Sequence, residues 1–258
     1  MESTQTEEAP KVDVKEPVKP IGEVIIGNTD PRSLTEEQFI NSPDILYHGT
    51  EKPFDFSKNF DYIKFDSPHT RTLGAGFYVT PDQKDAELFS EAFGAHEPLA
   101  IPFLPYKARM FDFRAEGGTG RKNAPVPVEL MREWAERYKQ FYDSQYADYA
   151  PGEDKRLDGV KLIIMENFTR YLTYINRLVA DNKPVDLRAM MGIDGDQNLS
   201  EMTSHLLKPL MVDRGFDGII YIEGGDHPEH RNTLPATYVF YNLDKIGTYK
   251  AWHDTDSE

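Results

Sequence analysis

Two short motifs carry side chains that could hold a flat, polar ligand. The first is the run 47–50, Tyr-His-Gly-Thr, and the second is the run 74–78, Gly-Ala-Gly-Phe-Tyr. A glycine lets a ligand approach the peptide backbone closely, so Gly49 suits a binding position. His48, at the end of an expected strand, can donate one hydrogen bond without bringing a fixed charge. Together the two motifs indicate a ligand-binding site.

Other residue clusters are less specific. The spacing Gly74-x-Gly76 lacks the third glycine and the βαβ context of a dinucleotide fingerprint, which excludes a Rossmann interpretation. Asp226, His227 and His230 lie close together but without a fixed helical spacing, so we expect no metal site. The chain has no cysteine, which excludes a disulfide framework, a thiolate metal site and a cysteine nucleophile.

Charge limits the class of partner. The 258-residue chain has a formal net charge of −15, which disfavours a nucleic-acid partner because phosphate binding depends on lysine and arginine. The stretch 101–125 runs against this balance, with five cations and two acids for a local net charge of +3. We favour solvated loop charges over a basic patch as its interpretation. The residues concerned are Lys107, Arg109, Asp112, Arg114, Glu116, Arg121 and Lys122.

No part of the sequence resembles a membrane segment. The apolar cluster 24–26 is far too short for a secretory signal, and no later run approaches the roughly 20 apolar residues that span a bilayer. We therefore expect a cytoplasmic protein that does not bind a membrane. Residues 1–21 are rich in charge and proline without an apolar period, which predicts a disordered acidic tail before a single domain over 22–258.

The first half of the domain alternates short helices and strands. A helix is expected over 34–40, with Ser33 and Glu36 forming a capping box. A strand over 45–48 and another over 74–80 would carry the two motifs. A helix over 81–92 would begin with Thr80 as its N-cap and Pro81 as its first residue.

A proline-rich segment and a helical block follow. Residues 99–109 have strand-like apolar content, but Pro102 and Pro105 predict an edge or irregular strand. From 126 to 212 apolar residues recur at helical spacing, and a third helix is expected to start near Ser200. The two main stripes are Leu130, Trp134, Tyr138 and Phe141, and then Ile164, Phe168, Tyr171, Leu172, Ile175 and Val179.

Strands return at 218–222 and 237–241. Because strands flank a helical block of about 117–213, the element order predicts an α+β fold with a helical insertion rather than a doubly wound βαβ sheet.

The two motifs, with the final run 238–246, resemble the ADP-ribosyltransferase family of the diphtheria-toxin and poly-ADP-ribose-polymerase type. The likeness is greatest to the small domains of bacteriophage and bacterial proteins, and it covers most of 45–92 and 214–246. It implies a split antiparallel sheet and NAD as the substrate. The helical block matches nothing in the minimal fold of that family.

The resemblance also implies a set of binding residues. In that family the histidine contacts the adenosine ribose, which assigns this role to His48, and the next glycine, here Gly49, binds the nicotinamide amide through its backbone. Tyr78 matches the tyrosine that packs on the nicotinamide ring, and Phe89 matches the second aromatic wall. We add three further candidate NAD-binding residues from the same motifs: Thr50, Arg71 and Gly76.

Arg71 and Ala86 each leave a question open. Arg71 could meet the NAD pyrophosphate, since a guanidinium binds phosphate as a bidentate fork, but a surface salt bridge is an equal alternative. The polymerase branch has a serine eight residues after its tyrosine, and this chain has Ala86 there. That difference argues against polymerase-like activity.

The acidic catalytic position of the family also differs. Transferases of this type place a glutamate at the start of the last strand, and the matching residue here is Thr237. A threonine can hydrogen-bond a ribose hydroxyl but supplies no negative charge to the cation that forms as nicotinamide leaves. Glu223, Asp226 and Glu229 precede that strand, and we favour Glu223 as a substitute over the alternative that all three are ordinary loop charges.

The resemblance implies transfer of one ADP-ribose from NAD to a macromolecule, a protein rather than a nucleic acid, with release of nicotinamide. His48, Tyr78, Thr237 and Glu223 are the candidate catalytic residues. Two alternatives stay open: a non-catalytic module that binds NAD or ADP-ribose or another protein, and an NAD glycohydrolase.

Overall fold

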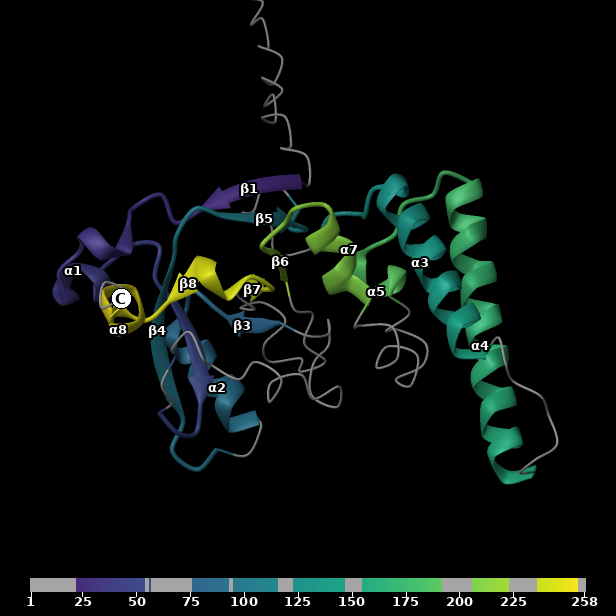
Figure 1. Ribbon diagram of the computed structural model, residues 1–258, viewed down its shortest axis with the longest axis horizontal. Coiled ribbons are helices and arrows are strands. Elements are labelled where there is room, and N and C mark those ends of the chain that lie inside the picture. The colour runs from purple at the N-terminus through teal and green to yellow at the C-terminus, as the bar shows by residue number, and fades with distance from the viewer. Residues whose placement is uncertain are drawn as a thin grey trace, which may run out of the picture.

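The computed structural model describes residues 22–53, 56, 76–92, 95–115, 123–146, 155–191, 206–222 and 236–254. These residues form two β-sheets with helices around them, which confirms the α+β class (Figure 1). The larger sheet has five strands in the order β1 (Gly22–Ile26), β5 (Ala108–Asp112), β6 (Gly218–Ile222), β7 (Ala236–Phe240) and β3 (Phe77–Val79).

The larger sheet is mixed rather than purely antiparallel. Its β5 and β6 strands run parallel, with Met110 paired to Gly218, while the other three pairings are antiparallel. This corrects the expectation of an antiparallel sheet. A parallel pair needs a crossover of a dozen residues or more, and the helical insertion between β5 and β6 supplies it.

The smaller sheet has three strands in the order β2 (Leu46–Thr50), β4 (Leu99–Pro105) and β8 (Ile246–Gly247). The proline-bearing strand β4, predicted as an edge or irregular strand, therefore lies in the middle of this sheet. The reason is that β8 pairs with β4 at Leu104 and Pro105, whereas Pro102 lies opposite Tyr47 of β2. Pro102 therefore lies in a part of β4 that pairs with only one of the described strands, β2. Its missing N–H does not interrupt the pairing with β8.

The two sheets meet where β2 runs beside the end of β3. The N–H of Tyr47 donates to the carbonyl of Thr80 at 2.7 Å, and the N–H of Thr80 donates back to Tyr47 at 2.9 Å. A buried apolar cluster fills the space between the sheets; its members include Leu46, Phe77, Phe103, Met110, Ile220 and Phe240.

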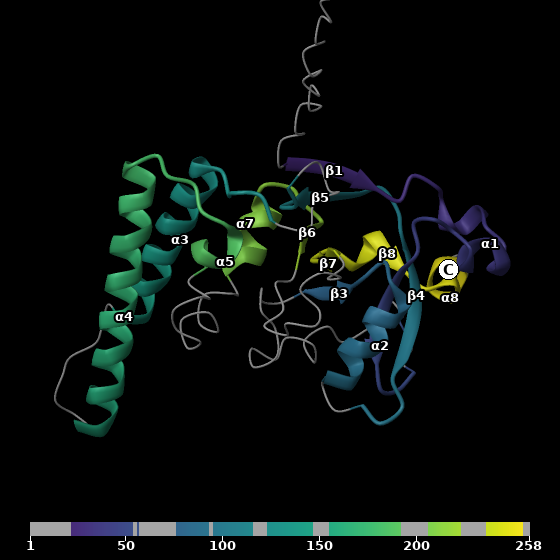
Figure 2. The same cartoon turned by 180° about the vertical axis from the view of Figure 1, so that it is seen from behind.

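The insertion contains α3 (Val128–Tyr146), α4 (Lys155–Ala180), α5 (Leu187–Met190) and α7 (Leu207–Asp213). Both ribbon views place α3 and α4 at one end of the molecule, and at the other end α1 (Glu36–Ile40) and α8 (Tyr249–His253) (Figures 1 and 2). The predicted stripe on α3 is confirmed, since Leu130, Trp134 and Tyr138 are buried. The expected helix start near Ser200 lies outside the described residues, and α7 begins at Leu207.

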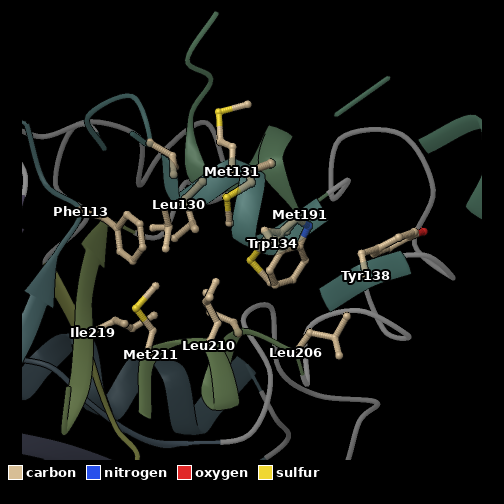
Figure 3. Packing of buried hydrophobic residues seen from close by; sticks show 14 of the residues in the cluster. Phe113, Leu130, Met131, Trp134, Tyr138, Met191, Leu206, Leu210, Met211 and Ile219 are labelled. Carbon is tan, nitrogen blue, oxygen red and sulfur yellow. The ribbon is translucent and has the colours of Figure 1, made fainter. Parts of the chain in front are cut away.

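The core of the insertion continues onto the larger sheet. Figure 3 shows Leu130 and Met131 of α3 beside Phe113, while Leu210 and Met211 of α7 lie near Ile219 of β6. One face of the five-stranded sheet therefore packs against the helical block, and the other face packs against the smaller sheet.

Two predicted helix caps are wrong. Thr35, not Ser33, caps α1, forming its capping box with Gln38, because Ser33 ends a 3-10 turn and its hydroxyl donates to Asp30.

The second cap concerns α2 (Gln83–Ala92). Asp82 accepts from the backbone N–H of Lys84 at 2.8 Å, whereas Thr80 belongs to the bridge with Tyr47.

The last helix among the described residues, α8, was not predicted from the sequence. Helix α8 packs near the smaller sheet, where the indole N–H of Trp252 donates to the carbonyl of Leu104 at 3.1 Å. None of the helices in the described ranges has both the length and the apolar character to cross a membrane.

Candidate functional site

The two sequence motifs meet in the structure. Nδ1 of His48, on β2, lies 2.8 Å from the carbonyl oxygen of Tyr78, on β3. A carbonyl oxygen only accepts hydrogen bonds, so Nδ1 carries the proton and acts as the donor. Residues separated by thirty positions in the chain are thereby joined at one point.

The ring of His48 lies among the core aromatics between the sheets. It stacks on Phe77 with ring centroids 4.6 Å apart, and it meets the edge of Phe103 at 6.5 Å. Both phenylalanines belong to the buried cluster between the sheets. The aromatic contacts and the bond to Tyr78 fix the orientation of the imidazole, which is itself half-buried.

Gly49 and Tyr78 lie on the opposite face of the same strands. The antiparallel bridge between Tyr47 and Thr80 brings Gly49 level with Tyr78. Because side chains alternate along a strand, Tyr47, Gly49, Tyr78 and Thr80 share one face, while His48 points to the other. Tyr78 is half-buried on this face and packs against the core of the helical block.

Close packing accounts for both glycines of the motifs. A Cβ on Gly49 would lie 1.9 Å from the carbonyl oxygen of Ala86 in α2, and one on Gly76 would lie 2.0 Å from Cγ1 of Val239. Both positions therefore exclude a side chain because of the fold itself. Whether the peptide of Gly49 also binds an amide remains a prediction.

Helix α2 lies against β2 and carries the second aromatic candidate. Phe89 is half-buried on this helix. Thr50, at the end of β2, uses its hydroxyl locally, donating to the carbonyl of Lys52 at 3.0 Å. The structure thus places Thr50 beside the site but engages its side chain in a turn.

Two buried hydroxyls near the motifs have no hydrogen-bond partner among the described residues. They belong to Thr80, which is 4% exposed, and Ser90, which is 5% exposed. A buried hydroxyl without a partner typically costs about 1–3 kcal/mol, so such groups are rare in folded proteins. Neither residue was predicted as a site residue, although Thr80 follows Tyr78 by two positions in a strand segment whose side chains alternate between two faces.

Thr237 lies on the same face as Tyr78. Val239 of β7 pairs with Tyr78, and Thr237 lies two residues before Val239 on β7. Diagonal neighbours of this kind are roughly 7–8 Å apart, within reach of an aromatic side chain. Thr237 is 4% exposed, and Tyr221 of β6 lies directly opposite it.

The end of β6 is fixed by an asparagine that the sequence did not point out. The side-chain amide of Asn123 donates to the carbonyl of Ile222 and accepts from its N–H, both at 2.8 Å. Ile222 lies opposite Ala236, the residue before Thr237. Asn123 therefore holds the strand end from which the chain continues to Glu223.

Two cations of the 101–125 stretch, Arg109 and Arg114, are paired with acids. The guanidinium of Arg109 binds Glu23 at 2.8 Å and lies 4.6 Å from the ring centre of Phe216, and its hydrogen bond to Glu23 lowers the pKa of that carboxyl. Arg114 binds Asp112 at 2.7 Å. Arg121 and Lys122 lie outside the described residues.

Several predicted site residues also lie outside the described ranges, namely Arg71, Glu223, Asp226, His227, Glu229 and His230. In the part of the chain that the structure describes, no three histidines or carboxylates come together to hold a metal ion. Comparison of the chain with protein-family models, with curated proteins and with solved structures found no match. The function must therefore be inferred from the motifs and their geometry.

Proposed function

We propose that this protein binds NAD and transfers one ADP-ribose to a protein acceptor, releasing nicotinamide. The observation that supports the proposal most is the 2.8 Å hydrogen bond between His48 and the carbonyl of Tyr78. It joins the two motifs that resemble the ADP-ribosyltransferases. Two unrelated strands in separate parts of the fold would not be joined by such a bond.

The face that carries Tyr78 suits a flat ring. Tyr78 on β3 lies level with Gly49, and Phe89 belongs to α2, the helix whose Ala86 carbonyl packs against Gly49. An aromatic pair contributes on the order of 0.5–1.5 kcal/mol beyond the burial of its area. The hydroxyl of Thr80, buried on this face without a partner among the described residues, gives the ring a polar group to meet.

The proposed reaction exchanges one bond at the ribose C1′ atom. The bond between C1′ and the pyridinium nitrogen breaks, and its electron pair leaves with nicotinamide, which becomes neutral. A nucleophilic atom of the acceptor then bonds to C1′ and loses its proton to the solvent. The protein accelerates this exchange by binding the departing ring and by stabilising the positive charge that develops on the ribose.

That positive charge calls for an acid near Thr237. Thr237 is neutral, and its backbone position on β7 brings it to the face of Tyr78. Glu223 follows Ile222 in the sequence, and Ile222 pairs with Ala236, the residue before Thr237. We propose that Glu223 supplies the charge and Thr237 a hydrogen bond to the ribose.

A non-catalytic NAD-binding module is the second candidate, and the neutral Thr237 is the observation that favours it. The two candidates bind the same ligand but differ in turnover. An NAD glycohydrolase would use the same pocket with water as the acceptor.

Incubation with labelled NAD and cell lysate distinguishes the candidates. We expect nicotinamide release together with labelled protein, and loss of both in Tyr78→Ala. The matched control is Tyr174→Ala, since Tyr174 lies 45% exposed on α4. Release without labelled protein indicates a glycohydrolase, NAD binding without release indicates a binding module, and no NAD binding contradicts the proposal.

A further inference from the structure

Thr80 carries a buried hydroxyl that the fold leaves unused. Its backbone N–H and carbonyl both pair with Tyr47, so its place between the sheets is fixed. Its side chain is 4% exposed, and Oγ1 has no hydrogen-bond partner in the described part of the chain. A valine would fill the same space without the cost of burying a polar group, so the hydroxyl requires an explanation outside the packing of the fold.

The position of Thr80 relates this hydroxyl to the aromatic face. Thr80 follows Tyr78 by two residues in extended chain, so both side chains point to the same side. Tyr47 and Gly49 share that side, because Tyr47 lies opposite Thr80 across the bridge. A flat ring resting on Tyr78 would therefore present its edge toward Thr80.

The chemistry of this face selects a neutral group. Tyr47, Gly49, Tyr78 and Thr80 carry no charge, whereas a phosphate would be matched by arginine or lysine. A hydroxyl both donates and accepts a hydrogen bond, and so does a carboxamide. We propose that the Thr80 hydroxyl recognises the carboxamide of the nicotinamide ring, an inference that rests on the function proposed above. Thr80 is thus a binding residue that selects the ring end of NAD.

Calorimetry with two ligands tests this assignment. NAD carries the nicotinamide ring and ADP-ribose lacks it, so only the NAD affinity depends on a contact with the carboxamide. Thr80→Val should weaken NAD binding about two- to tenfold, the net effect of one neutral hydrogen bond, and should leave ADP-ribose binding unchanged. Thr80→Ser retains the hydroxyl and should keep the wild-type preference. If the valine variant does not fold, Thr80→Ala removes the same hydroxyl with less bulk.

The matched control is Thr173→Val on α4, where the exposed hydroxyl of Thr173 donates to the carbonyl of Thr169 at 2.8 Å. Binding of both ligands should be unaffected there. Equal weakening of NAD and ADP-ribose by Thr80→Val, or no weakening of NAD, overturns the role of Thr80 while leaving the proposed function standing. A wild-type protein that binds neither ligand overturns both.

Discussion

A buried indole in the helical block and two buried hydroxyls beside the strand pair β2–β3 differ in their hydrogen bonds. In the block, the indole N–H of the fully buried Trp134 donates to the hydroxyl of Tyr171 at 3.2 Å, amid close aromatic packing. Beside β2 and β3, the hydroxyls of Thr80 and Ser90 are buried without a partner among the described residues. The bond from Trp134 to Tyr171 contributes to the stability of the block, whereas the hydroxyls of Thr80 and Ser90 are polar groups that a ligand could use.

The two regions nevertheless share one sheet. The face of β3, β6 and β7 that carries Tyr78 and Thr237 also supplies Ile219 and Val239 to the core of the block. A change in the block should therefore alter how much protein is folded, while loss of an unpartnered hydroxyl beside the strand pair should alter what the folded protein binds. Substitutions in each region test this difference.

The largest effect is expected in the block. Trp134→Ala removes a fully buried indole and should lower the free energy of unfolding by about 3–5 kcal/mol, because a cavity is left in the core. Urea unfolding measures the change. NAD affinity per folded molecule should stay the same. Tyr174→Ala, at an exposed position of α4, is the control and should change stability by no more than about 0.5 kcal/mol.

The next largest effect is expected on turnover. Glu223→Gln should lower the rate of nicotinamide release by about 10²–10³, the effect typical of losing a preorganised electrostatic group. NAD affinity and melting temperature should change little. Glu166→Gln, an exposed residue paired with Arg170 on α4, is the matched control. A Glu223→Gln protein with wild-type turnover would show that the charge comes from another acid.

Gly49→Ala tests the contact between α2 and β2. The added Cβ would lie 1.9 Å from the carbonyl oxygen of Ala86, so the helix must move away from the strand. Overpacking of this kind costs about 1–3 kcal/mol, and thermal unfolding should show the loss. Gly22→Ala is the control, because nothing lies within 4 Å of the position of its Cβ. Unchanged stability in Gly49→Ala would mean that α2 moves away from β2 without loss of stability.

The smallest effect is expected at Thr237. Thr237→Ala removes one neutral hydroxyl and should slow turnover only about two- to tenfold, since such a hydrogen bond contributes about 0.5–1.5 kcal/mol. NAD affinity should barely change. A loss of 10²-fold or more, well above the effect of a single neutral bond, would move the catalytic role from Glu223 to Thr237.

Local patterns in the sequence predicted the helices of the insertion and the strands of the core well. The stripe Leu130, Trp134 and Tyr138 predicted a helix because its spacing places all three on one face. Strand β6 was predicted over the same residues, 218–222, that the structure shows. The helix caps were predicted less well. Ser33 and Thr80 are residue types that often cap helices, but Ser33 bonds the carbonyl of Asp30 in a turn and Thr80 pairs with Tyr47 in a bridge.

The candidate site was predictable as two motifs but not as a geometry. Nothing local indicates that Nδ1 of His48 meets the carbonyl of Tyr78, or that the His48 ring faces the core while Gly49 faces α2. A strand alternates its side chains, so which face is buried depends on what packs there. Local sequence favours Thr80 as a helix cap, because its partner in the structure, Tyr47, is distant in sequence.

Residue types and their spacing along one segment were sufficient to predict most of the element types and the helical insertion between strands, and they single out the two motifs as candidates. The tertiary structure alone decided the parallel pairing of β5 and β6, the central place of β4, the neutralisation of Arg109 by Glu23 and the buried hydroxyl of Thr80. Pairing, register and burial depend on contacts between distant segments, and no local pattern carries that information.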